Sequence, residues 1–232
     1  IVLAQPGSPF PLQRLAQLYR DRDGSIAQLV KDMEAKSQAA GAEQYAALVT
    51  LAGVYKLDGR GEDAAKTFAR AAEMKPNDPA AILALARLLE EKGDAAAART
   101  RFAQALPLET AASDREQTLR TLMTLSLELK DFDAAKSFHK QLVQASAQSL
   151  FVKGELGREL FARNEFERAE SEFKALVDQS AGDNRALAPA LKDLGKAQAK
   201  AQKSRESIET LRRALRVAGA EGVGVRPRVH DA

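Results

Sequence analysis

The chain has 232 residues, of which 45% are hydrophobic and 29% are charged, and its formal net charge is +3. This balance excludes an intrinsically disordered chain, and the small positive charge is not the signature of a nucleic-acid-binding protein. The sequence has no Cys and only two His, which excludes disulfides, thiolate metal sites and cysteine nucleophiles and leaves little for a histidine metal site. No run of 18 apolar residues occurs, so we predict no membrane insertion.

The first ten residues have two interpretations. Residues 1–4 are similar to the end of a signal peptide, with Val2 and Ala4 at the small-residue positions of a cleavage site. Residues 5–9 have the composition of a linker between domains. Because the first residue is Ile and not Met, we expect the chain to be cut or processed from a longer protein, and the cellular compartment stays open.

Residues 11–43 predict a degenerate first helix pair or a cap. Leu15, Ala16 and Tyr19 have the spacing of one helix face, which predicts a helix over residues 11–20. The apolar residues Ile26, Leu29 and Met33 predict a second helix over residues 24–38.

From residue 44 onward the sequence repeats itself. A small residue followed four positions later by a larger one recurs every 34 to 38 residues. The copies begin at Ala64, Ala98, Ala135, Ala169 and Ser207. Each copy follows a segment with large, small and large residues on one helical face. We therefore predict first helices near 44–57, 79–91, 115–129, 149–162 and 187–200, and second helices near 61–74, 95–106, 132–145, 166–178 and 203–217.

A short break separates the two helices of each pair. Gly59, Gly93 and Asn164 accept the left-handed backbone that ends a helix, and an Asp or Ser then caps the next helix. Lys130 and Gln202 occupy the same position in the other two repeats and suit it less well.

This pattern resembles the tetratricopeptide repeat (TPR) family over roughly residues 44–217. The first copy follows the family pattern without a gap, with Leu in place of Trp, at Leu48, Leu51, Ala52, Tyr55, Ala64, Phe68, Ala71 and Pro76. The resemblance implies an all-α fold, a right-handed superhelical α-solenoid of about six antiparallel helix pairs. The five repeats would span 44–78, 79–114, 115–148, 149–186 and 187–218, and residues 219–232 would form a loop and the start of a truncated further repeat.

Three positions depart from the pattern. Pro107 predicts that its helix ends near Leu106 and that residues 108–115 form a long connection. His139 stands where the other copies have Phe or Leu, and we expect Phe138 to replace it in the core through a local shift. The Gly-rich residues 219–224 follow a helix and not a strand, which predicts a flexible loop and not a phosphate-binding motif.

We predict that the chain is not an enzyme. Ser137 and Ser171 each begin an S-x-x-K motif, but they occupy the same place in successive repeats and lack the partner motifs of acyl transfer. A nucleophile is not needed twice on equivalent helix faces. We therefore assign no catalytic, cofactor-binding or metal-binding residue, and expect no cofactor.

The resemblance also implies that the first helices line a concave groove. Val49 and Gly53 stand where some family members have the Lys and Asn that hold a chaperone tail, which argues against that ligand. The residues that we expect to line the groove are mostly basic or apolar: Lys56, Leu83, Arg87, Arg120, Thr124, Leu127, Arg158, Phe161, Lys192 and Lys196. Such a surface predicts a protein–protein interaction scaffold that binds a peptide segment or partner protein of acidic character.

The alternative is a structural or self-assembling spacer within a longer repeat protein. Residues 185–232 carry 11 Lys and Arg against 5 Asp and Glu, but the aromatic residues that would accompany nucleic-acid binding are absent there. We therefore expect no nucleic-acid partner, and self-association remains the competing function.

Overall fold

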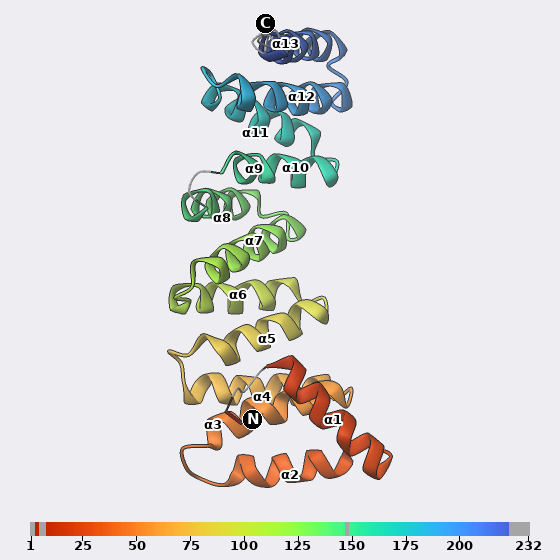
Figure 1. Cartoon of the computed structure of the whole chain (residues 1–232), viewed down its shortest axis with the longest axis vertical. Coiled ribbons are helices and arrows are strands. Elements are labelled where there is room, and N and C mark those ends of the chain that lie inside the picture. Colours follow the sequence, from red (N-terminus) through yellow and green to blue (C-terminus); the bar gives the residue numbers. More distant parts are fainter. Residues whose placement is uncertain (1–2, 5–7, 147–148, 223–232) are drawn as a thin grey trace, which may run out of the picture. The chain divides into compact units, whose positions relative to one another are not determined.

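The computed structural model describes residues 3–4, 8–146 and 149–222. Within these ranges the chain is helical and contains no strand (Figure 1). The expected all-α class is therefore confirmed, and in chain order the helices form the successive pairs of an α-solenoid. The chain divides into two compact units, Ile1–Leu129 and Lys130–Ala232, which we describe one after the other.

Unit 1 contains seven α-helices and one short 3-10 helix in its described residues. They are α1 (Pro9–Asp23), α2 (Ala27–Gln38), α3 (Gln44–Leu57), α4 (Gly61–Met74), α5 (Pro79–Glu91), α6 (Ala95–Ala105), η1 (Leu106–Leu108) and α7 (Ala112–Glu128). The bounds of α3, α4 and α5 are those that the repeat pattern predicts. The helix before Pro107 ends as expected, and a 3-10 turn follows it.

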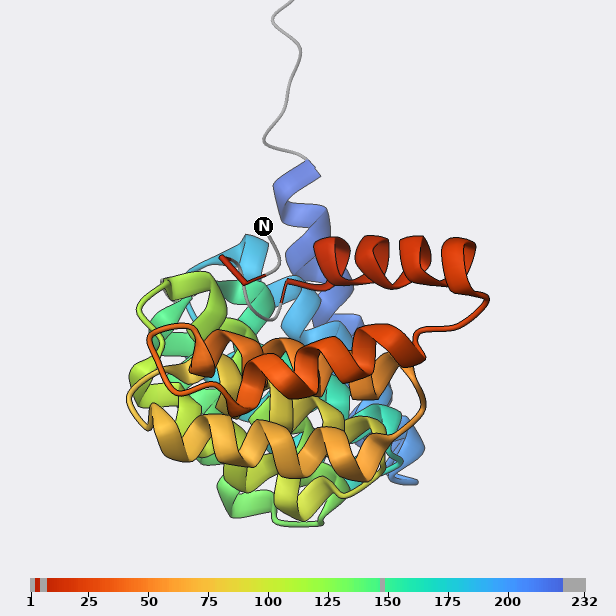
Figure 2. The same ribbon diagram turned by 90° about the horizontal axis from the view of Figure 1, so that it is seen from below.

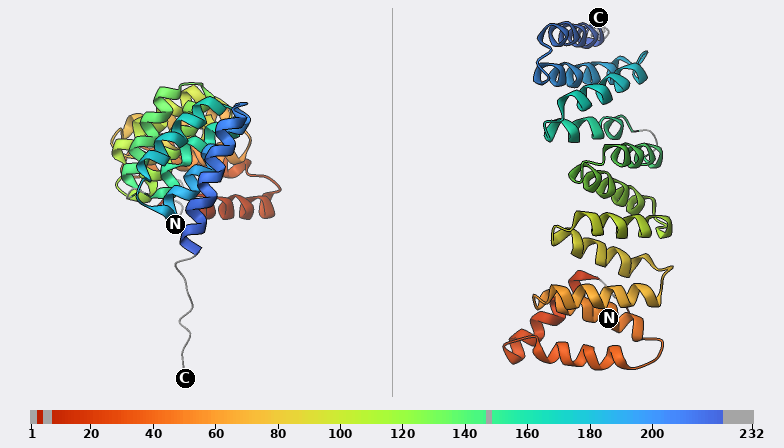
Figure 3. Two further views of the ribbon diagram at one scale, coloured as in Figure 1. Left: turned by 90° about the horizontal axis from the view of Figure 1, so that it is seen from above. Right: turned by 180° about the vertical axis from the view of Figure 1, so that it is seen from behind.

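Unit 2 contains six helices in its described residues. They are α8 (Phe132–Ala145), α9 (Leu150–Lys153), α10 (Glu155–Ala162), α11 (Phe166–Gln179), α12 (Asn184–Lys200) and α13 (Ser204–Gly222). The succession from α10 to α13 is also visible from behind (Figure 3).

One type of turn joins the two helices of a pair. The backbone is left-handed at Gly59 and Gly93 and also at Lys130, Asn164 and Gln202, with φ between 56° and 78°. In the turns at Gly59, Gly93, Asn164 and Gln202, two residues donate backbone hydrogen bonds back into the preceding helix, as Lys203 N does to the Gln198 carbonyl at 2.9 Å. Asp94 and Asp131 then cap the following helices, accepting from Ala97 N at 3.0 Å and Ala134 N at 3.2 Å. The Lys and Gln turns therefore adopt the same geometry as the Gly turns.

Small residues allow the paired helices to approach each other. The first residues of four copies of the repeat (Ala64, Ala98, Ala135 and Ala169) are completely buried. The aromatic residues four positions later in three of them (Phe68, Phe102 and Phe173) are at most 4% exposed. In unit 2 the ring of Phe173 lies so close to Gly157 that a Cβ there would be 2.6 Å from Cε1. Glycine at 157 is therefore required by this packing.

His139 occupies the core position itself, so the expected shift to Phe138 is wrong. His139 is 8% exposed, and its Nε2 lies 2.7 Å from the Val152 carbonyl oxygen. Because a carbonyl oxygen only accepts, Nε2 carries the proton and donates it. This hydrogen bond gives the buried Nε2–H group of His139 a partner, so His139 can stay in the core and Phe138 need not replace it.

Several expected boundaries are also wrong. The long connection 108–115 is absent, because α7 begins at Ala112 and Thr118 on α7 donates a 2.8 Å hydrogen bond to the buried Glu109. The helix expected over 149–162 is interrupted at Gly154. Helix α12 begins three residues early, because Asp183 accepts from the Arg185 and Ala186 amides. Helix α13 continues to Gly222 where a loop from residue 219 was expected, and the expected repeat start at 225–232 lies outside the described residues.

A buried carboxylate connects the last two helix pairs of unit 2. Glu170 on α11 is 2% exposed and forms ion pairs with Lys174 at 2.7 Å and Lys203 at 2.8 Å. Burial acts to raise the pKa of Glu170, but the hydrogen bonds from the two lysines outweigh it, and the pKa is lower than usual. Because Lys203 lies in the turn between α12 and α13, Glu170 fixes that turn against α11.

We expect Glu170→Gln to destabilise the chain by about 1 to 2 kcal/mol at pH 7, because charge-assisted hydrogen bonds are lost and the exposed lysines recover water. The pKa of Glu170 is lower in the folded chain than its ordinary 4.5. Its stabilising effect is therefore complete above the unfolded pKa and disappears as the pH falls through the folded pKa. Urea unfolding of the wild type and of Glu170→Gln at pH 7 and at pH 3 measures this effect. If the two proteins differed in free energy of unfolding by the same amount at both pH values, the prediction would be contradicted.

The turn at Gln202 predicts a stabilising substitution. Gln202 has φ 64°, which costs a residue with a Cβ about 1 kcal/mol. Gln202→Gly should therefore raise the free energy of unfolding by about 0.5 to 1 kcal/mol in urea titrations. The reverse change at the equivalent turn, Gly93→Gln, should lower it by a similar amount. Destabilisation by Gln202→Gly would show that the Gln side chain itself supports the turn.

Candidate functional site: the first-helix surfaces

In unit 1 the first helices α3, α5 and α7 carry six of the ten predicted groove residues. Lys56 at the end of α3 forms an ion pair with Glu91 at the end of α5, with a Nζ–Oε1 distance of 2.6 Å. Arg87 on α5 is exposed and has no ion pair within the described residues, and Arg120 on α7 is half-buried. The structure therefore brings the ends of these helices together.

Carboxylates share this surface with the predicted cations. Partial burial and the charges of Glu128 and Glu91 raise the pKa of Glu90, against the opposing effect of Arg87. Glu90 and Glu91 on α5 and Glu128 on α7 thus balance the three predicted cations. The surface of unit 1 is mixed in charge and not basic. Glu90 and Glu128 each lie three to four residues from a predicted groove residue, so their place in the sequence already puts them near this surface.

The predicted apolar groove residues of unit 1 are not equally accessible. Leu127 is 3% exposed, so it belongs to the core and its prediction as a groove residue is wrong. Leu83 and Thr124 are half-buried and remain partly accessible.

Helix α1 covers the first-helix surface of the first full repeat. A Cβ at Gly53 would lie 2.4 Å from Cδ2 of Leu12 on α1, so the two helices touch where glycine leaves room. Tyr19 on α1 donates a 2.9 Å hydrogen bond to Asp32 on α2. Figure 2 shows α1 to one side of α2 and not stacked on it as in a regular pair. Gly53, and Val49 one turn earlier, are therefore buried and do not line an open groove.

In unit 2 the predicted groove residues lie on α10 and α12. Arg158 stacks over the ring of Phe151, with its Cζ 4.4 Å from the ring centroid, and donates a hydrogen bond to the Phe151 carbonyl oxygen. A Cβ at Gly154 would lie 2.6 Å from Nη1 of Arg158. The interruption between α9 and α10 thus makes room for this side chain. Arg158 is held in one orientation by its own unit.

A small cavity of about 190 Å³ lies beside Arg158. Its lining combines aromatic and charged side chains: Arg158, Phe161, Phe173, Asp193 and Lys196. The ring of Phe161 also contacts Phe166, with centroids 5.4 Å apart. Lys192 lies one turn before Lys196 on α12, and both are exposed without an ion pair among the described residues.

The structure thus brings three of the four predicted residues of unit 2 to one cavity and adds two that the sequence reasoning missed. Asp193 directly follows the predicted Lys192, but the search for a basic groove passed over it. Phe173 comes from the second helix α11, which the resemblance places outside the groove. No described helix is both long and apolar enough to cross a membrane.

Comparison with known proteins supports the fold. Residues 55–120 match the family model described as a tetratricopeptide repeat. A TPR protein from Parabacteroides merdae ATCC 43184 has a similar structure, with a TM-score of 0.54 and 14% sequence identity over 89% of this chain and 78% of that chain. The MamA protein is similar with a TM-score of 0.51 and 14% identity, over 83% of this chain and 98% of its own. No curated protein sequence matches. The resemblance to the TPR family is confirmed, and at these identities the structures bear on the fold alone.

The contact at Gly53 predicts that a large side chain there separates α1 from α3. Overpacking costs about 1 to 3 kcal/mol, so Gly53→Leu should speed amide hydrogen exchange in α1 by roughly tenfold while α5 and α6 stay protected. The control is Gly219→Leu on α13, where a Cβ would meet nothing within 4 Å. Unchanged protection of α1 would show that α3 accommodates both side chains.

Proposed function

We propose that this chain is a non-catalytic scaffold that binds an acidic segment of a partner protein on the first-helix surface of unit 2. The observation that carries the proposal is the cavity beside Arg158, where aromatic side chains lie next to cations. The helical-repeat fold supports the general role, because rigid stacked helices present such a surface with little ordering on association.

The cavity has a size suited to one apolar side chain of a ligand. Its volume of about 190 Å³ and the rings of Phe161 and Phe173 favour an aliphatic or aromatic group. Arg158 and Lys196 border it, and Lys192 extends the positive charge along α12. Asp193 offsets one of these three cations, which leaves a local charge of +2. A ligand with acidic residues around one apolar residue would complement this arrangement.

Arg158 is oriented in advance for such a ligand. Its contacts with the ring and the carbonyl oxygen of Phe151 hold the side chain without a ligand. A guanidinium fixed in this way loses less conformational freedom when it binds a carboxylate. Phe151 is itself 70% exposed and extends the apolar part of the surface.

Unit 1 suits an acidic ligand less well. Glu90, Glu91 and Glu128 lie among its cations, and Lys56 is already paired with Glu91. These carboxylates would repel an acidic segment. We therefore assign the binding of such a segment to unit 2.

A self-assembling or spacer role is the second candidate, and α13 provides the observation that favours it. Ile208 and Leu215 lie two turns apart on α13 and are 51% and 73% exposed. Such an apolar stripe suits a further helix pair or a second copy of the chain. Light scattering across concentration distinguishes the roles, because self-assembly raises the measured mass with concentration and partner binding does not.

Groove binding is tested by reversing the two lysines on α12. The double substitution Lys192→Glu with Lys196→Glu should weaken binding of a labelled Glu-Glu-Leu-Glu-Glu peptide by at least about fivefold, because attraction is replaced by repulsion. Fluorescence anisotropy with the full chain measures the affinity.

Two controls make this test specific. The matched variant Lys31→Glu with Lys66→Glu has the same net charge change on the exposed faces of α2 and α4, and it should bind nearly as the wild type does. A peptide with Gln in place of Glu should bind weakly to both. An equal loss in both double variants would show that only net charge matters and would overturn the assignment.

A further inference from the structure

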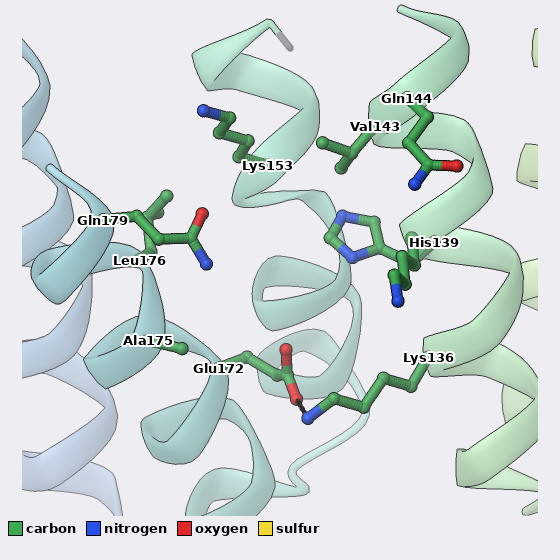
Figure 4. Close-up of a pocket in the computed structure, with 10 residues that line it drawn as sticks. Lys136, His139, Val143, Gln144, Lys153, Glu172, Ala175, Leu176 and Gln179 are labelled. Carbon is green, nitrogen blue, oxygen red and sulfur yellow. Dashed lines mark hydrogen bonds and ion pairs between the residues drawn. The ribbon is translucent and has the colours of Figure 1, made fainter.

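A second hollow lies in unit 2 and is lined by side chains that the proposed groove does not use. It has a volume of about 360 Å³ and is formed by the second helices α8 and α11 and by the end of α9. Figure 4 shows His139, Lys153 and Gln179 facing this shared space from three different helices. The lining residues are Lys136, His139, Lys140, Val143, Gln144, Lys153, Glu172, Ala175, Leu176 and Gln179. We call it the outer pocket.

The outer pocket carries excess positive charge. Lys136 is paired with Glu172 across the pocket, at 2.7 Å between Nζ and Oε1. Lys140 and Lys153 have no ion-pair partner among the described residues. Three lysines against one glutamate leave a charge of +2 with His139 neutral. Two ammonium groups are thus available to a ligand, while the third is held by the protein.

The backbone around α9 holds Lys153 at the edge of the pocket. The Val152 carbonyl accepts the hydrogen bond of His139 Nε2, which joins α9 to α8. On the other side, a Cβ at Gly154 would lie 3.3 Å from Cδ2 of Leu176 on α11. The end of α9 is therefore fixed between α8 and α11, so Lys153 is not on a free loop.

Among the five copies of the repeat, only this one has a basic residue at both its second and its sixth position. Lys136 and Lys140 are the second and sixth residues of the copy that begins at Ala135. The same two positions in α4 are Ala65 and Ala69. Repeat packing therefore does not require lysine at either position.

We propose that the outer pocket binds the acidic side chains of a short segment of a partner protein, independently of the first-helix surface. Lysines attract carboxylates without demanding the planar geometry that arginine imposes. Val143 on α8 and Ala175 and Leu176 on α11 give the pocket apolar lining for the aliphatic parts of such a segment. Gln144 and Gln179 bring amides suited to a peptide backbone. An inorganic phosphate would use the lysines but neither the apolar lining nor the amides, which favours a peptide.

The experiment uses the full chain with Lys192→Glu and Lys196→Glu as its background, so that the proposed groove is already impaired. Isotope-labelled protein is titrated with the Glu-Glu-Leu-Glu-Glu peptide and followed by NMR. We expect the NMR signals of the backbone amides of Gln144, Ala175 and Gln179 to change position as peptide is added. These changes should saturate, and the saturation curve gives the affinity. Because the groove is already impaired in this background, failure of the groove proposal does not change these NMR signals. The two proposals can therefore fail independently of each other.

Two further variants test the charge and the shape of the outer pocket. Lys140→Glu with Lys153→Glu should weaken this binding by at least about fivefold. Ala175→Phe adds no charge but fills the pocket, and it should weaken binding by a similar factor. Ala175 is exposed, so the ring does not disturb the core. The control is Ala103→Phe, which changes another exposed alanine, on α6. It should bind the peptide with the affinity of the Lys192→Glu, Lys196→Glu background.

The outcomes decide the proposal. Loss of binding in both the charge and the filling variants supports it. Binding unchanged by Ala175→Phe would mean that the peptide responds to surface charge alone, and would overturn it. Displacement of the peptide by inorganic phosphate at equal concentration would assign the pocket to small anions and would also overturn it.

Discussion

Every layer of this chain depends on how closely the two helices of a pair approach. Alanine or glycine stands where the helices touch, and a large side chain fills the space beside it, as Phe173 does at Gly157 and Leu211 does at Gly195. One helix pair does not bury enough apolar area to be stable, so each layer relies on its neighbours. This requirement constrains a few small residues strongly and leaves the outward positions of each helix free to vary.

Much of the fold could be predicted because these constraints are local and recur. The bounds of α3, α4 and α5 follow from helical periodicity together with turn residues such as Gly59 and Gly93. The turns at Lys130 and Gln202 show that the repeat imposes its geometry even on residues that disfavour it. A boundary was missed where a side-chain contact accompanies it, as where Thr118 on α7 donates a hydrogen bond to Glu109 in the short connection before that helix.

The candidate sites were less predictable, because a site depends on which side chains meet across helices. The resemblance placed Arg158, Phe161 and Lys196 on first helices, but it gave no account of Phe173 from α11 or of Arg158 held by Phe151. The outer pocket was invisible for the same reason. Lys140 and Lys153 are thirteen residues apart and belong to different helices, and only the fixed end of α9 brings them to one space. The prediction of a basic groove also gave too little weight to the carboxylates that accompany Lys56 and Arg87.

The position of α1 has a practical consequence for anyone who shortens this chain. A fragment that begins at residue 44, where the repeat pattern becomes regular, would lose Leu12 and expose the apolar side of α3 around Gly53 to solvent. Such a fragment would keep every repeat and yet be prone to aggregate. A recombinant fragment should therefore begin before Pro9, because α1 shields the first regular repeat.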